Sequence, residues 1–155
     1  MIEIERKFLV KNDAYKSKSC KVETITQGYL STDPKRSVRI RICNNEAYIT
    51  IKGESSKSGV SRFEWEKKID VDEALNLIFL CHKSIIKKIR HYIPFGNHTF
   101  EVDEFLGDNA GLVIAEIELK EEDESFEHPK WLGKEITTIE KYYNSQLSQN
   151  AFINW

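Results

Sequence analysis

The chain has 155 residues, 40% of them hydrophobic, and its 23 Lys and Arg nearly balance its 25 Asp and Glu, leaving a formal net charge of -2. This composition excludes a chain that is disordered throughout, and the balanced charge argues against a broad basic surface for duplex nucleic acid. Apolar stretches such as Leu77 to Cys81 are far shorter than the roughly 18 residues of a membrane span. We therefore expect a single domain over residues 1–155 that binds neither a nucleic-acid duplex nor a membrane.

The first residues, Met1 to Lys7, alternate charged and apolar side chains, whereas a signal peptide has a basic head followed by a long apolar block. The sequence thus predicts a protein that stays in the cytoplasm. Its three cysteines, Cys20, Cys43 and Cys81, form no Cys-x-x-Cys pair and are expected to act as small hydrophobic residues without chemistry.

Apolar and polar residues alternate with a period of two through most of the chain, and this period predicts about eight β-strands. In chain order, the predicted strands are centred on Ile2 to Val10, Glu23 to Leu30, Ser37 to Cys43, Ala47 to Lys52, Arg62 to Asp70, Ile86 to Ile93, Thr99 to Phe105 and Leu112 to Lys120.

Helices are fewer in this pattern. One is predicted over Asp72 to Cys81, where an Asp cap precedes an apolar run, and another over Ile139 to Leu147, after the possible caps Thr137 and Thr138. A short helix is also possible near Asn12 to Lys16. The expected fold class is therefore α+β, mainly β.

The polar side of these strands is almost entirely charged. A solvated sheet face explains this pattern in any single strand, but Thr, Ser and Gln would then be common, and the charges recur in seven strands. The acidic positions are Glu3, Glu5, Glu64, Glu66, Glu101, Asp103, Glu116 and Glu118, and the basic positions are Lys7, Arg39, Arg41, Lys52, Arg62, Lys88 and Arg90. Such a repeated charged face indicates a function beyond solubility.

If the sheet curls into a barrel with this face inward, its lumen holds more charge than a packed core tolerates without an ionic ligand. Paired carboxylates suit hard cations such as Mg²⁺ or Mn²⁺, and clustered Arg and Lys suit a polyanion such as a phosphate chain. Phosphoryl transfer requires both kinds of group at one site. The pattern therefore predicts a metal-phosphate site.

Short motifs along nearly the whole chain resemble those of the CYTH superfamily, also called triphosphate tunnel metalloenzymes. The opening Glu3-Ile4-Glu5-Arg6-Lys7 is similar to the Glu-x-Glu-x-Lys start of that family. The segments that follow in the family's order are Gln27-Gly28-Tyr29-Leu30, Arg39-Ile40-Arg41, Thr50-Ile51-Lys52-Gly53, Arg62-Phe63-Glu64-Trp65-Glu66, Lys88-Ile89-Arg90, Glu101-Val102-Asp103-Glu104-Phe105, Ala115-Glu116-Ile117-Glu118-Leu119, Gly133-Lys134-Glu135-Ile136-Thr137 and Tyr142-Tyr143-Asn144.

The resemblance implies a closed, eight-stranded antiparallel β-barrel, open as a tunnel, with a few flanking helices. It implies that Lys7, Arg39, Arg41, Lys52, Arg62, Lys88 and Arg90 bind the triphosphate of the substrate. It also implies that Glu3, Glu5, Glu64, Glu66, Asp103, Glu116 and Glu118 bind Mg²⁺ or Mn²⁺, with Lys7 and Glu5 central to catalysis.

Several activities fit such a tunnel. The compact chain is most similar to small bacterial members with inorganic triphosphatase activity, so we place hydrolysis of tripolyphosphate first. Class IV adenylyl cyclase activity comes second, hydrolysis of thiamine or nucleoside triphosphates third, and a non-catalytic polyphosphate or nucleotide-binding module is the alternative from another class. Outward-facing apolar residues also make a homodimer possible.

Overall fold

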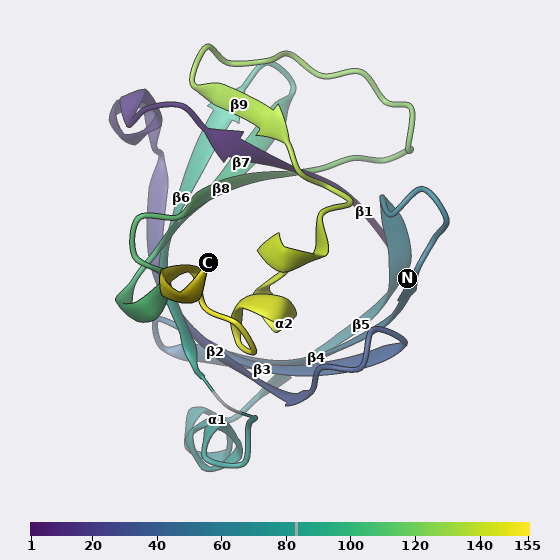
Figure 1. Ribbon diagram of the computed structural model, residues 1–155, viewed down its shortest axis with the longest axis vertical. Coiled ribbons are helices and arrows are strands. Elements are labelled where there is room, and N and C mark those ends of the chain that lie inside the picture. Colours follow the sequence, from purple (N-terminus) through teal and green to yellow (C-terminus); the bar gives the residue numbers. More distant parts are fainter. Residues whose placement is uncertain (83) are drawn as a thin grey trace.

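The structure is a computed structural model that describes residues 1–82 and 84–155. Its strands form one antiparallel sheet in the order β5-β4-β3-β2-β6-β7-β8-β1-β9. The strands are β1 (Ile2–Val10), β2 (Lys21–Ser31), β3 (Arg36–Cys43), β4 (Glu46–Ser55), β5 (Ser61–Ile69), β6 (Ile86–Phe95), β7 (His98–Phe105), β8 (Val113–Glu118) and β9 (Leu132–Glu135). A further pairing of β5 with β1 closes the first eight into a ring (Figure 1), which confirms the predicted barrel.

Two large apolar clusters lie on the outer face of the barrel, because the inward positions of the strands are charged. Phe8, Phe100 and Ile117 belong to one of them, which is covered by Trp131 and Leu132 from the chain around β9. The other cluster joins the outer faces of β3 and β4 to the helix α1 (Val71–Ile78). Burial of these apolar side chains supplies the main stabilisation of the barrel from outside.

The helix α1 begins one residue earlier than predicted and ends at Ile78 instead of Cys81. Its N-cap is Asp70, whose carboxylate accepts a hydrogen bond from the backbone N–H of Asp72, while Glu73 completes a capping box. Asp70 therefore takes the capping role, since its extended backbone leaves the carboxylate free to meet the first turn.

At one end of the barrel, inward positions are apolar instead of charged. Leu9, Ile86, Phe105 and Ile114 each lie two residues from an inward charge and pack against the C-terminal segment, residues 136–155. In Figure 1 this segment crosses the ring with its 3₁₀ helices η3 (Glu140–Tyr142) and η4 (Phe152–Asn154) and the short helix α2 (Asn144–Leu147). The C-terminal segment therefore forms a floor across one end of the barrel.

The structure differs from the sequence prediction in two places beyond the main barrel. The predicted helix over 139–147 is interrupted at Tyr143, whose extended backbone (φ -66°, ψ 138°) separates η3 from α2. The short strand β9 was not predicted. The possible helix near Asn12 is present as the 3₁₀ helix η1 (Ala14–Lys18), and the 3₁₀ helix η2 (Gly107–Asn109) follows β7. Within the described residues, no helix is long and apolar enough to cross a membrane.

The approach of β9 to β1 requires a glycine. A Cβ atom added to Gly133 would lie 2.8 Å from the carbonyl oxygen of Leu9, and backbone cannot move aside as a flexible side chain can. We expect Gly133→Ala to lower the free energy of unfolding by about 1–3 kcal/mol, as overpacking does. Urea unfolding measures the loss, and the exposed neighbouring variant Lys134→Ala should change stability by less than about 0.5 kcal/mol. Equal stability of the two variants would contradict this account of the β1–β9 contact.

Candidate active site

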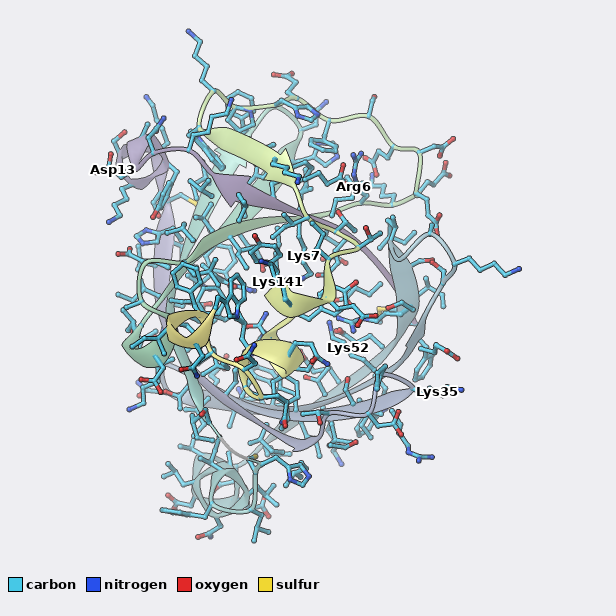
Figure 2. All side chains as sticks on the ribbon, in the orientation of Figure 1. Arg6, Lys7, Asp13, Lys35, Lys52 and Lys141 are labelled. Atoms are coloured by element: carbon cyan, nitrogen blue, oxygen red, sulfur yellow. The ribbon has the colours of Figure 1, made fainter. Side chains whose placement is uncertain are left out.

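The lumen of the barrel contains a cavity of about 980 Å³. It is lined by all seven predicted phosphate-binding residues, Lys7, Arg39, Arg41, Lys52, Arg62, Lys88 and Arg90, and by the predicted metal-binding residues Glu3, Glu5, Glu64, Glu66, Glu116 and Glu118. In Figure 2, Lys7 and Lys52 lie within the ring of strands, whereas Lys35 lies outside it. Strand alternation therefore brings residues from distant parts of the sequence into one cavity.

One side of the cavity, which we call the basic wall, is formed by Arg39 and Arg41 on β3 and by Lys88 and Arg90 on β6. The intervening strand β2 holds this wall together through Gln27, whose side-chain oxygen accepts a hydrogen bond of 3.1 Å from Arg41 Nε. The basic wall is thus a continuous surface across three neighbouring strands.

The positive charge of the basic wall is only partly balanced by nearby acidic side chains. Burial, followed by the positive charges of Arg39 and Arg90, lowers the pKa of Arg41 to about 10. Burial also lowers the pKa of Lys88 to about 7, although Asp103 lies 2.6 Å away and opposes this shift. Within the described residues, buried Arg39 Nε has no hydrogen-bond partner. An anion in the cavity would satisfy this donor and relieve the repulsion between the cations.

The opposite side, which we call the acidic wall, is formed by Glu64 on β5, Glu3 and Glu5 on β1, and Glu118 on β8. Lost solvation, followed by the negative charges of Glu3, Glu5 and Glu64, raises the pKa of Glu118. The charges of these three carboxylates therefore disfavour the charged form of Glu118 on the neighbouring strand. Such repulsion is relieved when a cation binds among them.

Basic side chains balance part of the negative charge of the acidic wall. Lys52 Nζ lies 2.6 Å from a carboxylate oxygen of Glu3 and 2.7 Å from one of Glu64. Arg62 contacts the same Glu3 at 3.3 Å and Glu5 at 3.6 Å. Lysine and arginine therefore occupy positions around the carboxylates from which a metal ion could displace them.

The donor set fits a hard divalent cation, because the acidic wall offers only carboxylate oxygens, the ligands that Mg²⁺ and Mn²⁺ prefer. Across the described residues, however, no three acidic, histidine or cysteine side chains already converge as a metal site. Glu3 and Glu64 instead share Lys52. The residues thus suit such a cation chemically, and binding would require the carboxylates to exchange partners.

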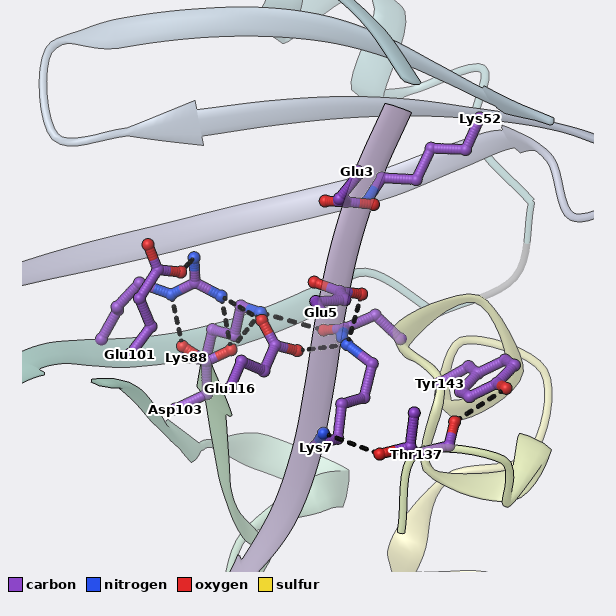
Figure 3. A network of polar contacts seen from close by, with 12 residues as sticks. Glu3, Glu5, Lys7, Lys52, Lys88, Glu101, Asp103, Glu116, Thr137 and Tyr143 are labelled. Atoms are coloured by element: carbon purple, nitrogen blue, oxygen red, sulfur yellow. Dashed lines mark hydrogen bonds and ion pairs between the residues drawn. The ribbon is translucent and has the colours of Figure 1, made fainter. Parts of the chain in front are cut away.

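Lys7 lies where the acidic wall meets the basic residues. Its Nζ is 2.6 Å from Glu116 and 2.9 Å from Glu5 (Figure 3), and the second oxygen of Glu116 is 3.2 Å from Arg90. Burial opposes the charged form of Lys7, but the two carboxylates outweigh it and raise the Lys7 pKa. Lys7 is therefore a permanent ammonium group in the centre of the site.

The structure places Asp103 differently from the other predicted metal-binding residues. Its side chain is 0% exposed and lies behind the cavity wall, where both its oxygens accept hydrogen bonds from Arg90, at 2.7 and 2.8 Å. One of these oxygens also accepts a bond of 2.6 Å from Lys88. Arg90 contacts Glu101 as well, further toward solvent. Asp103 therefore anchors two cations of the basic wall.

Several uncharged residues that were not predicted to belong to the site also line the cavity: Tyr29, Thr137, Tyr143 and Asn144. The Asn144 side-chain oxygen accepts hydrogen bonds from Lys88, at 3.0 Å, and from Gln27, at 3.1 Å. Tyr29 shares the inward parity of Gln27, so strand alternation could have found it. For the residues of the C-terminal segment strand parity gave no signal, and only the two closing segments that resemble the CYTH family include Thr137, Tyr143 and Asn144.

Comparison with known proteins agrees with this geometry. The CYTH domain family matches residues 1–150. The chain is 47% identical to an inorganic triphosphatase of Acetivibrio thermocellus, over 99% of this chain and 97% of that protein. It is 34% identical to an inorganic triphosphatase of Nitrosomonas europaea, over 96% of this chain and 97% of the relative.

A crystal structure of an inorganic triphosphatase has a similar fold, with a TM-score of 0.66 and 31% identity over 94% of this chain and 93% of that chain. The family match and the two relatives each extend over nearly the whole chain. On these grounds, and with the charged barrel lumen that the structure shows, the protein belongs to the CYTH family.

Proposed function

We propose that this protein is a metal-dependent triphosphatase that hydrolyses inorganic tripolyphosphate to pyrophosphate and orthophosphate. The observation that carries this proposal is the arrangement of the acidic wall on β5, β1 and β8 opposite the basic wall on β3, β2 and β6. A pure anion binder would gain nothing from four carboxylates facing its ligand, because they repel it. The names of the two relatives support tripolyphosphate as the substrate.

In this proposal, the phosphate chain lies along the basic wall and reaches across to Lys7. Arg39 would donate its unpaired Nε–H to a phosphate oxygen. Lys7 would replace its ion pair with Glu116 or Glu5 by one with a second phosphate oxygen. The full phosphate-binding set is Lys7, Arg39, Arg41, Lys52, Arg62, Lys88 and Arg90. These cations would stabilise the charge that develops on the transferred phosphoryl group.

The acidic residues have a complementary role in the proposal. Mg²⁺ or Mn²⁺ would be held by carboxylates lining the cavity, namely Glu3, Glu5, Glu64, Glu66, Glu116 and Glu118. When bound, the cation supplies charge neutralisation and polarisation of the phosphate oxygens. Asp103 is enclosed by Lys88 and Arg90, and its proposed role is therefore to orient these two cations and not to bind the metal. A cytoplasmic location and a homodimer stay predictions.

Substrate choice separates this proposal from its alternatives. Purified protein is incubated with tripolyphosphate, ATP or thiamine triphosphate in the presence of Mg²⁺, and all products are resolved by ion chromatography. We expect the fastest turnover with tripolyphosphate. Cyclic AMP and pyrophosphate from ATP would instead indicate a cyclase, and tight binding of all three compounds without products would indicate a binding module.

Removal of divalent cations is expected to stop turnover without unfolding the protein. Excess EDTA should lower the rate by about 100-fold or more, because the phosphate chain then lacks the cation that neutralises its charge and polarises its oxygens. The melting temperature should change little, since Lys52 and Arg62 pair with the acidic wall in the metal-free protein. Added Mg²⁺ should restore the rate. Full activity in EDTA would contradict the proposed metal dependence.

A further inference from the structure

The edge of β1 has a gap between its two partner strands. Residues 2–4 of β1 pair with β5, and Phe8 and Val10 pair with β9. Between these pairings, the backbone N–H of Lys7 donates to the hydroxyl of Thr137 at 3.1 Å, and the Lys7 carbonyl accepts from Ile136 N–H at 2.8 Å. The chain thus leaves β9, fills the gap in the barrel and continues into the C-terminal segment.

The Thr137 hydroxyl connects this gap to the outer surface. It donates its single proton to Glu135 at 2.7 Å, which leaves an oxygen lone pair for the Lys7 N–H. Glu135 in turn is fixed by two hydrogen bonds from Arg6, of 2.8 and 2.6 Å. A surface ion pair therefore orients a buried hydroxyl that holds the backbone of the lumen lysine.

The backbone of Thr137 also orients a second group in the cavity. Its carbonyl oxygen accepts a hydrogen bond of 3.0 Å from the hydroxyl of Tyr143 (Figure 3). Burial raises the pKa of Tyr143, and the nearby charges of Lys7 and Arg62 oppose this shift. Tyr143, held by this hydrogen bond, lines the same cavity as Lys7 and Arg62.

We propose that Thr137 is a positioning residue for tripolyphosphate hydrolysis, which it supports by fixing Lys7 through its hydroxyl and Tyr143 through its carbonyl. This inference rests on the proposed function of the cavity. The hydroxyl is the testable part, because valine has nearly the same shape and lacks it. Loss of the bond would leave the Lys7 backbone held to the C-terminal segment only by its hydrogen bond from Ile136 N–H, at the residue whose ammonium group lies between Glu5 and Glu116.

The test compares Thr137→Val with Thr137→Ser, which keeps the hydroxyl, and with Thr138→Val, which removes the hydroxyl of the exposed neighbour outside the cavity lining. Thr137→Val should lower kcat for tripolyphosphate about tenfold while KM changes less than twofold, because the basic wall is untouched. Thr137→Ser and Thr138→Val should stay within about twofold of the unmodified protein in both constants. Equal losses in Thr137→Val and Thr137→Ser, or none in Thr137→Val, would overturn the proposal.

A second measurement does not depend on turnover. Hydrogen exchange followed by NMR should show a protected Lys7 amide in the unmodified protein and in Thr137→Ser, and at least tenfold faster exchange in Thr137→Val. Glu135→Gln, a milder change at the surface, should shift exchange and kcat in the same direction. If the unmodified protein does not hydrolyse tripolyphosphate, the proposed function is wrong, whatever the exchange data show for Thr137. If the Lys7 amide stays protected in Thr137→Val, the positioning role fails whatever the activity.

Discussion

Replacing Lys7 by methionine is expected to lower kcat/KM for tripolyphosphate by about 100-fold or more. Methionine keeps a similar length and removes the ammonium group that lies 2.6 Å from Glu116 and 2.9 Å from Glu5. The loss of one preorganised charge from an active site typically has an effect of about this size. Steady-state kinetics with saturating Mg²⁺ measures it.

The matched control is Lys35→Met, which removes the same charge from an exposed residue between β2 and β3 (Figure 2). We expect this variant to retain the activity of the unmodified protein within about twofold. Because Lys7→Met also breaks a buried ion pair, its fold must be checked by circular dichroism at the assay temperature. An unchanged kcat/KM in folded Lys7→Met protein would contradict the proposed role of Lys7 in phosphate binding and catalysis.

Asp103→Asn is expected to lower the free energy of unfolding by about 3–5 kcal/mol, the usual cost of removing one partner from a buried ion pair. Asp103 is 0% exposed, and its carboxylate compensates Arg90 and Lys88. Asparagine has the same shape but no negative charge, so both cations would be left buried beside Arg41 with less compensation. Urea unfolding at neutral pH measures this loss.

Glu101→Gln is the control for this prediction, since Glu101 is on the same strand, contacts the same Arg90 and is 35% exposed. We expect it to cost about 1 kcal/mol or less, because solvent replaces part of the lost interaction. Losses of equal size in Asp103→Asn and Glu101→Gln would contradict the anchoring role of Asp103.

Strand periodicity allowed much of the barrel and its lumen to be predicted from sequence. Once Glu3, Glu5 and Lys7 are placed on one face of a strand, alternation forces them to share a side of the sheet. The same rule placed Arg39 with Arg41 and Lys88 with Arg90, and the structure brings these pairs together on the basic wall. Residue parity, applied strand by strand, thus finds most of the charged residues that line the cavity, although Lys120 and Glu124 line it as well.

The depth of a residue in the lumen could not be predicted in this way, since parity gives the face and not the neighbours. Asp103 has the inward parity of Glu101, yet Lys88 and Arg90 enclose it. The packing of the C-terminal segment could not be predicted either, although two of its segments resemble the CYTH family. Thr137 looked like a helix cap, but its hydroxyl bonds to Lys7, 130 residues away in sequence, and no local pattern records that contact.

The central claim is that one cavity combines metal-binding carboxylates and phosphate-binding cations to hydrolyse tripolyphosphate. The most direct test follows tripolyphosphate and the purified protein by ³¹P NMR, first in EDTA and then after addition of Mg²⁺. The account predicts a stable spectrum in EDTA, followed by the appearance of pyrophosphate and orthophosphate in equal amounts once Mg²⁺ is present. An unchanged tripolyphosphate spectrum with Mg²⁺, from protein shown to be folded, would contradict it.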